Sequence, residues 1–194
     1  IFIATLNVRN SIESYIERLG RYFRADVNVT LSQPYRLERV TRDLLAAPGV
    51  GAVEGWSGAL ANVVTQAGMA GEAVQLIAPP EGSQVIEPIL HSGRWLAPGD
   101  QNAIALSELF LDRFPTLQVG DTVRLKIGLK ESDWVVVGFF QFAGRSSGLI
   151  AYTHYDSLTR VTGTYGRSAS YRILAAGEAL SVEQQEQLAE RIEA

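Results

Sequence analysis

The chain has 194 residues, enough for one large or two small domains, and its 46% hydrophobic and 20% charged residues are typical of a folded globular protein. Its formal net charge of −4 argues against a general nucleic-acid-binding protein, because such proteins normally carry a basic surface that displaces counterions from phosphates. The absence of cysteine excludes disulfides, thiol catalysis and cysteine-ligated zinc.

The pattern of residues 1–24 predicts a helix that continues outward from a membrane-spanning segment. The opening "IFIA" lacks the charged region and cleavage site of a signal peptide. Four apolar residues cannot cross a bilayer, which takes ~20, so we expect a longer protein whose preceding span ends here. Apolar residues then recur at three- and four-residue intervals, at Ile12, Tyr15, Ile16, Leu19, Tyr22 and Phe23. The pattern predicts an amphipathic stalk helix or, if the apolar start is ignored, an ordinary amino-terminal surface helix.

Residues 25–84 predict a β-α-β-β unit. A half-buried strand is predicted from the alternating apolar residues Val27, Val29 and Leu31. After a turn at Pro34, apolar residues at helical spacing predict a helix that the sequence "APG" at 47–49 ends. A second strand begins at Val50, and residues 62–78 predict two strands around a glycine-rich turn.

Three arginines, Arg36, Arg39 and Arg42, occupy every third position along the predicted helix. A phosphate-binding stripe would need such a row of basic side chains. An ordinary solvated helix face shows the same pattern far more often, and we favour that interpretation.

Residues 85–148 are richer in predicted strands. The segments "VIEPIL" and "NAIALSE" predict strands on either side of "HSGRWLAPGDQ". A short helix is predicted at "ELFLDRF", with Ser107 as its N-cap and Glu108 in its first turn. Two further strands are predicted over residues 121–142, around a turn at "LKESD".

Helix and strand alternate again in residues 149–194. The segment "LIAYT" predicts a strand, "YDSLTRVTG" a short helix and "SASYRILAA" another strand. A final helix begins at Ser181, which forms a capping box with Gln184. A strand-rich segment thus interrupts an α/β pattern, and the expected fold class is α+β.

One run of motifs resembles the extracytoplasmic core domain of MacB/FtsX-type ABC-transporter permeases. It comprises a Gly-Arg-aromatic element, an acidic residue, a strand ending in Leu-Ser-Glu, a Val-Gly-Asp turn and a Val-Val-Gly strand end. The matching positions are Gly93, Arg94 and Trp95; Asp100; Leu106, Ser107 and Glu108; Val119, Gly120 and Asp121; and Val136, Val137 and Gly138. Residues 25–56 also resemble the opening strand, helix and strand of these domains.

The resemblance implies a domain architecture. Such domains follow the first transmembrane helix, which continues outward as a stalk, and they contain a porter-like α/β part interrupted by a smaller β-rich part. We accordingly expect a stalk helix over residues 1–24, a porter-like subdomain over 25–84 and 149–194, and an inserted β-rich subdomain over 85–148.

The resemblance also implies a function. It predicts a non-catalytic domain on the extracytoplasmic face of a cell membrane, coupled to the transmembrane helices of its own chain and to a cytoplasmic ATP-binding subunit. A cargo or accessory protein outside the membrane is the expected further partner. The stalk and the exit helix, residues 181–194, would transmit ATP-driven motion as stiff levers. Catalytic residues, cofactors, metals and nucleic acid are not expected.

The motif residues have architectural explanations. Gly93, Gly120 and Gly138 lie at predicted strand ends or turns, where positive φ or close backbone approach favours glycine. Asp121 can bond the backbone of its own turn, and Trp95 offers a large apolar surface for a core. A binding patch around Trp95 is the functional alternative.

A serine hydrolase is the first competing hypothesis. Gly55-Trp56-Ser57-Gly58-Ala59 is close to the Gly-x-Ser-x-Gly turn of α/β-hydrolases, and Asp133 and His154 follow Ser57 in the required order. His91 and Asp121 are the other candidates. The segment after Ser57 predicts a strand, however, where a nucleophile elbow needs a helix. Gly55 and Gly58 are then expected to allow a kink or bulge.

A free-standing extracellular binding module is the second competitor, and it predicts polar flanking sequence. Metal and nucleotide chemistry have little support in the sequence. The two histidines are far apart, and there is no HExxH, no Asp-x-Asp-x-Asn loop and no P-loop.

Overall fold

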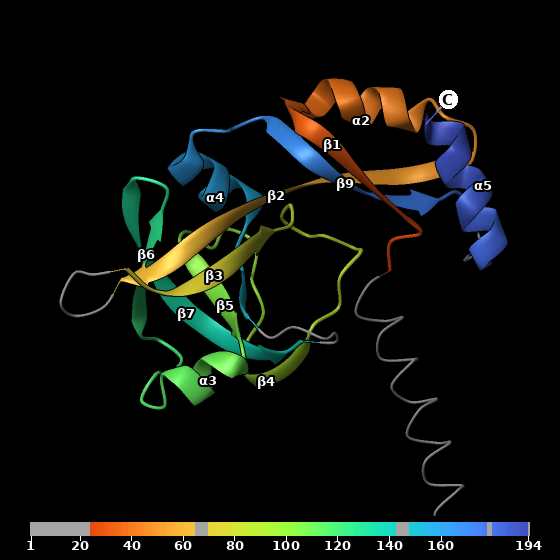
Figure 1. Ribbon diagram of the computed structural model, residues 1–194. Helices are drawn as coiled ribbons and strands as arrows, with labels where there is room; N and C mark the ends of the chain where they lie inside the picture. The colour runs from red at the N-terminus through yellow and green to blue at the C-terminus, as the bar shows by residue number, and fades with distance from the viewer. Residues whose placement is uncertain (1–23, 65–69, 143–147, 178–179, 194) are drawn as a thin grey trace, which may run out of the picture.

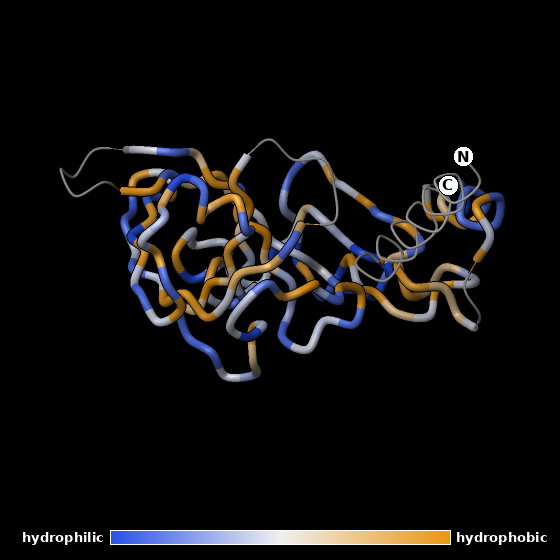
Figure 2. The backbone as a smooth tube through the Cα atoms, turned by 90° about the horizontal axis from the view of Figure 1, so that it is seen from below, coloured by the Kyte–Doolittle hydropathy of each residue, from blue (hydrophilic) through white to orange (hydrophobic). Residues whose placement is uncertain are grey.

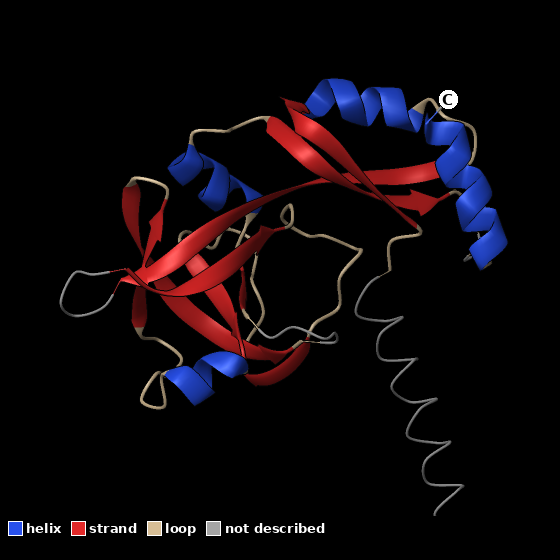
Figure 3. Ribbon diagram, viewed as in Figure 1, coloured by secondary structure: helices blue, strands red, loops and turns tan. Residues whose placement is uncertain are grey.

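The structure, a computed structural model, describes residues 24–64, 70–142, 148–177 and 180–193, which form an α+β fold (Figures 1 and 3). The strands in these ranges are β1 (Val27–Arg36), β2 (Val50–Val64), β3 (Ala70–Ala78), β4 (Ile89–Gly93), β5 (Ala103–Ser107), β6 (Thr122–Ile127), β7 (Lys130–Gln141), β8 (Leu149–Tyr152) and β9 (Arg167–Ala175). The helices are α2 (Leu37–Leu45), α3 (Leu109–Arg113), α4 (Tyr155–Thr162) and α5 (Val182–Glu193). The predicted α+β class is confirmed.

The nine strands form one hydrogen-bonded network in the order β1-β9-β2-β3-β8-β5-β7-β4, with β6 paired to β2 and β7. The β3–β8 and β5–β7 pairs are parallel, and the other pairs are antiparallel. Such a mixed sheet lets strands that are distant in sequence lie side by side.

Strand β2 joins the two ends of the molecule (Figure 1). Residues 50–56 pair with β9, whereas residues 57–64 pair with β3, so the partner changes between Trp56 and Ser57. We call residues 24–56 with 167–193 the helix-covered end, and residues 57–166 the strand-rich end. One unbroken strand thus connects both.

At the helix-covered end, α2 and α5 lie over β1, β9 and the first part of β2 (Figures 1 and 3). Its core of buried side chains consists of Val27, Leu44, Tyr171, Ile173 and Leu188. The apolar positions of both helices recur at helical spacing, which directs one face of each helix onto the sheet. Helix packing therefore closes this core.

The strand-rich end holds two larger buried clusters. One lies between the second part of β2, β3, β6, β7 and the helices α3 and α4, and it includes Phe110, Trp134 and Leu158. The other includes Phe140 and Tyr152, and it also takes in Trp56 from the helix-covered end. Seen from below in Figure 2, hydrophobic and hydrophilic stretches alternate along the chain at both ends. This is the pattern of half-buried strands.

Most predicted elements are confirmed. Strands begin near Val27, Val50 and Leu149, and the helix over residues 37–45 ends before "APG". The capping box of α5 is present, because the Ser181 N–H donates to Gln184 Oε1 at 2.9 Å and the Gln184 N–H donates to Ser181 Oγ at 3.4 Å.

Three local predictions are wrong. Ser107 does not cap α3: it ends β5, and its Oγ accepts a hydrogen bond from the Ile150 N–H at 3.3 Å. The β6–β7 turn is Gly128–Leu129 rather than "LKESD", because Ile127 pairs directly with Lys130. Pro34 makes no turn, since β1 continues through it with a register irregularity between Thr30 and Tyr35.

The expected subdomain boundaries at 84/85 and 148/149 stay a prediction. Strand pairing does not break there, because β3 is joined through β8 to β5. The predicted stalk, residues 1–24, lies outside the described residues except for Arg24. Within the described ranges, no helix is long and apolar enough to span a membrane.

Candidate functional site

The predicted motif at residues 93–100 forms a clamped loop. The Arg94 guanidinium donates to both carboxylate oxygens of Asp100, at 2.7 and 2.9 Å. Asp100 Oδ2 also accepts the Ala97 N–H at 2.8 Å, and Arg94 donates to the Trp95 carbonyl at 3.0 Å. The hydrogen bond from Arg94 is the main reason that the pKa of Asp100 lies below its usual value. The pair therefore holds the loop closed.

The other motif residues pack against this loop or stabilise neighbouring turns. Trp95 is half-buried, with its ring centroid 5.2 Å from that of Tyr152 and 6.0 Å from that of Phe140. A Cβ on Gly138 would lie 2.3 Å from the Arg94 carbonyl oxygen, so only glycine fits this close approach. Asp121 accepts the Gln118 N–H at 2.8 Å within its own turn. These contacts favour the architectural interpretation over a binding patch at Trp95.

The Gly-x-Ser-x-Gly-like segment is not a nucleophile elbow. Residues 55–59 lie within the continuous strand β2, and Ser57 pairs with Ala78 of β3. The expected bulge is also absent there, since the register of β2 shifts only near its two ends, at Val50/Ala52 and Asn62/Val64. A Cβ on Gly55 would lie 2.0 Å from Leu37 Cδ1. Gly55 therefore makes room for α2.

Asp133 and His154, the acid and base of the hypothetical triad, contact residues other than Ser57. Asp133 accepts two hydrogen bonds from Arg124, at 2.7 and 3.0 Å, on the exposed β6–β7 hairpin. His154, at the N-cap of α4, contacts the Ala97 carbonyl oxygen through Nε2 at 3.0 Å. No hydrogen bond in the described part of the chain joins either residue to Ser57. His91 is exposed on β4, and no His, Asp or Glu cluster among the described residues could hold a metal.

Residues 24–26, where the predicted stalk ends and the described structure begins, contact both ends of the molecule; we call them the entry segment. The Arg24 N–H donates to the Val85 carbonyl at 2.9 Å, and its guanidinium forms an ion pair with Glu87. Two residues on, Asp26 accepts the Ala175 N–H of β9 at 2.9 Å and a weaker bond from Gln185 of α5 at 3.4 Å. The entry segment is thus tied to the strand-rich end, to β9 and to the exit helix.

The junction of the two ends is further tied by Glu54 of β2. Its carboxylate accepts hydrogen bonds from Trp56 Nε1 at 3.0 Å, Ser83 Oγ at 2.5 Å and the Gln84 N–H at 2.7 Å. On the Trp56 ring, the guanidinium of Arg172 lies 5.1 Å from the centroid, a cation–π arrangement. Burial lowers the pKa of Arg172 from its usual value.

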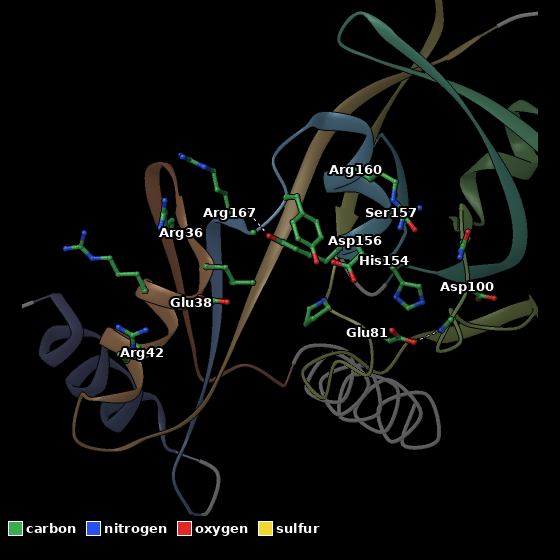
Figure 4. Close-up of a pocket in the computed structure, with 18 residues that line it drawn as sticks. Arg36, Glu38, Arg42, Glu81, Asp100, His154, Asp156, Ser157, Arg160 and Arg167 are labelled. Atoms are coloured by element: carbon green, nitrogen blue, oxygen red, sulfur yellow. Dashed lines mark hydrogen bonds between the residues drawn. The ribbon is translucent and has the colours of Figure 1, made fainter.

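A groove of about 1090 Å³ lies between α2 and α4. One wall carries Arg36, Arg42 and Arg167, and the other carries His154, Asp156 and Arg160 (Figure 4). Tyr155 also lines it, and its hydroxyl donates to the Arg167 carbonyl at 2.8 Å. Burial raises the pKa of this phenol.

The sequence pattern pointed to the arginines of one wall only, and we interpreted them as an ordinary solvated helix face. Arg36, Arg39 and Arg42 form the predicted stripe, and they do line the hollow. Arg160 of α4 and Arg167 at the start of β9 were missed, because they are distant in sequence and follow no shared pattern. Only the fold brings the two sets together.

The fold is shared with two solved transporter domains. The extracellular domain of the noncanonic ABC-type transporter YknZ from Gram-positive bacteria superposes with a TM-score of 0.58, over 83% of this chain and 86% of that domain, at 14% identity. The periplasmic region of MacB from Actinobacillus actinomycetemcomitans gives 0.56, over 84% and 79%, at 16% identity. The chain has the MacB-type extracytoplasmic domain fold. The resemblance predicted from residues 93–138 is therefore confirmed at the level of fold.

No family model matches the sequence, and neither does any curated protein. The similarity to the MacB-type domains therefore lies in the three-dimensional arrangement and in the short motifs. The Arg94–Asp100 clamp and the close approach at Gly138 give those motifs a physical role within the fold.

Proposed function

We propose that this chain is the non-catalytic extracytoplasmic domain of an ABC-transporter permease. In this role it passes ATP-driven motion of transmembrane helices to a cargo or partner outside the membrane. The ATP would be hydrolysed by a cytoplasmic subunit, because this sequence has no P-loop. The observation that carries the proposal is the MacB-type fold, which covers most of this chain and most of both solved transporter domains.

The contacts at the entry segment support a coupling role. A force applied through residues 1–24 would reach Val85 and Glu87 through Arg24, and β9 and α5 through Asp26. Motion reaching the domain at this point would therefore act on both ends together. The unbroken strand β2 and the bonds to Glu54 would carry it across the junction.

The test uses the intact parent protein with its ATP-binding subunit, reconstituted in lipid nanodiscs. A fluorophore on Leu129→Cys, at the fully exposed tip of the β6–β7 hairpin, reports movement of the domain. We expect ATP to change its signal. Two glycines inserted after Gly20, in the predicted stalk, should abolish that change while ATPase activity persists, because the helical lever is broken.

The matched control inserts two glycines after Thr116, in the exposed turn that follows α3. It should leave both the ATP-dependent signal and the ATPase activity unchanged. An ATP response that survives the insertion after Gly20 would refute the lever. A parent that lacks membrane spans and any ATP response would support the free-standing binding module instead.

A further inference from the structure

The groove between α2 and α4 lies across the junction of the two ends. Arg36 and Arg42 belong to the helix-covered end, while Glu81, Asp100 and Arg160 belong to the strand-rich end (Figure 4). A second hollow of about 530 Å³ adjoins it at α2 and shares Leu37, Glu38, Arg42, Pro80 and Tyr155 with the first. Together they form one open surface with a charged part and an apolar part.

Unpaired arginines dominate the charged part. In the described ranges, the guanidiniums of Arg36, Arg42, Arg160 and Arg167 make no hydrogen bond and no ion pair, and Arg39 has only a long 3.8 Å contact with Asp43. These four residues lie on α2, on α4 and at the ends of β1 and β9, and all four line the groove. They gather positive charge at one place in a chain with a formal net charge of −4.

Two of the four acidic groups in the groove are already engaged. Asp100 is paired with Arg94, and Glu81 accepts the Gly99 N–H. Glu38 and Asp156 have no such partner in the described residues, so they face the four unpaired arginines. Five arginines and four carboxylates line the groove, so its formal charge is 5 − 4 = +1, opposite in sign to that of the chain as a whole.

The apolar part supplies contact area beside these cations. Leu45, at the end of α2, is 46% exposed and lines the apolar part, and Tyr165, which is 73% exposed, lines the adjoining charged part. Leu37, Pro80 and Tyr155 line the floor. Arginine and tyrosine are the residue types enriched at protein interfaces and among their energetic hot spots.

We propose that this groove binds an acidic, amphipathic segment of a partner protein. Its carboxylates would pair with Arg36, Arg42, Arg160 and Arg167, and its apolar side chains would pack on Leu45 and Tyr165. A single small anion would gain little from such open, solvated arginines. Several carboxylates on one backbone gain more, because each contact raises the effective concentration of the next. The inference rests on this surface and not on the transporter assignment.

The test measures binding by the 194-residue chain alone. The probe is a fluorescein-labelled helical peptide with glutamates on one face and leucines on the other, followed by fluorescence anisotropy. We expect saturable binding that weakens as NaCl rises. Arg36→Gln with Arg160→Gln, one from each wall, should weaken it at least about tenfold. Glu38→Gln should strengthen it, because a like charge is removed.

The matched control also removes two positive charges. Arg113→Gln with Lys126→Gln, on α3 and β6 away from the groove, should leave peptide affinity unchanged. All variants should keep the parent's thermal midpoint, so that lost binding is not lost folding. Equal weakening by the control pair would mean non-specific charge attraction and would overturn the proposal.

Three other outcomes would also overturn it. A peptide of the same composition with glutamate and leucine scrambled should bind more weakly, and equal binding would show that no amphipathic segment is recognised. Vesicles containing phosphatidylglycerol that bind through Arg36 and Arg160 when the peptide does not would identify a lipid surface. Inorganic phosphate that stabilises the chain through the same arginines, again without peptide binding, would identify a small-anion site.

Discussion

The two ends of the molecule are built differently, although one strand runs through both. The helix-covered end closes a core of five buried apolar residues with two helices, α2 and α5. The strand-rich end buries seventeen residues in one cluster and ten in another, counting Trp56. Resistance to local opening rises with the number of buried contacts. We therefore expect the strand-rich end to resist local unfolding and the helix-covered end to open first.

The largest expected effect is at the rigid end. Trp134 is fully buried, and its Nε1 donates to Ser132 Oγ at 2.8 Å. Trp134→Ala should lower the free energy of unfolding by about 3–5 kcal/mol, because it leaves a large cavity in the main core. Urea denaturation followed by circular dichroism measures this. A loss below about 1 kcal/mol would mean that this cluster does not hold the fold together.

A smaller and more local effect is expected at the other end. Leu188 of α5 is fully buried in the helix-covered core. Leu188→Ala should cost about 2–3 kcal/mol, and hydrogen exchange should quicken in β1, β9 and α5 while β5 and β7 keep their protection. If protection fell equally in β5 and β7, the two ends would unfold as one unit, contrary to the comparison.

The packing of α2 against β2 provides the next test. The Cβ of Gly55→Ala would lie 2.0 Å from Leu37 Cδ1, so the Leu37 side chain must repack or the helix must shift. We expect a loss of about 1–2 kcal/mol from this overpacking. Leu37→Ala removes the obstructing atom, and a double-mutant cycle should therefore show that the two losses do not add. If the losses of the two single variants added in the double variant, contact with Leu37 would not be the cause of the Gly55→Ala destabilisation.

The smallest effect concerns two Arg–Asp pairs of similar geometry. Asp100→Asn should cost about 1 kcal/mol, since Asp100 is mostly buried and holds the loop, although half-exposed Arg94 is screened by solvent. Asp133→Asn, on the exposed hairpin, is the matched control and should cost less. If the two variants lowered the free energy of unfolding equally, closing the loop would add no stability beyond that of an exposed Arg–Asp pair.

The contribution of Asp100 should depend on pH. Arg94 lowers the pKa of the folded carboxyl, so its stabilisation is complete above the ordinary aspartate pKa of about 3.9. It is lost as pH falls through the lower folded pKa. The stability difference between the parent and Asp100→Asn should therefore be constant near neutral pH and shrink in acid. A difference that grows in acid would contradict the clamp.

Sequence patterns predicted the elements better than their connections. Periodicity identified β1, α2 and α5, because burial of one face imposes a repeat of two or 3.6 residues. Ser107 was misassigned because its hydroxyl serves the neighbouring strand β8, a contact that sequence does not reveal. The β6–β7 turn was misplaced because the polar run at 130–133 belongs to an exposed hairpin strand.

Contacts between distant segments were even harder to predict at the candidate site. The Arg94–Asp100 clamp joins residues of one loop, and the motif indicated both of them. The groove joins Arg36 to Arg160 across the junction, and no local pattern links them. Sequence alone therefore indicated the motif loop and the row of three arginines, which we interpreted as an ordinary solvated helix face.

The proposed function requires that the domain face the outside of a cell membrane as part of a membrane-anchored parent. The most direct measurement is the labelling of Leu129→Cys in the intact parent protein, in living cells, with a maleimide that cannot cross the cell membrane. Leu129 is 98% exposed at a hairpin tip, and these 194 residues contain no other cysteine. We expect the protein to be labelled in intact cells and to sediment with membranes. Labelling only after lysis, or a parent in the soluble fraction, would contradict it.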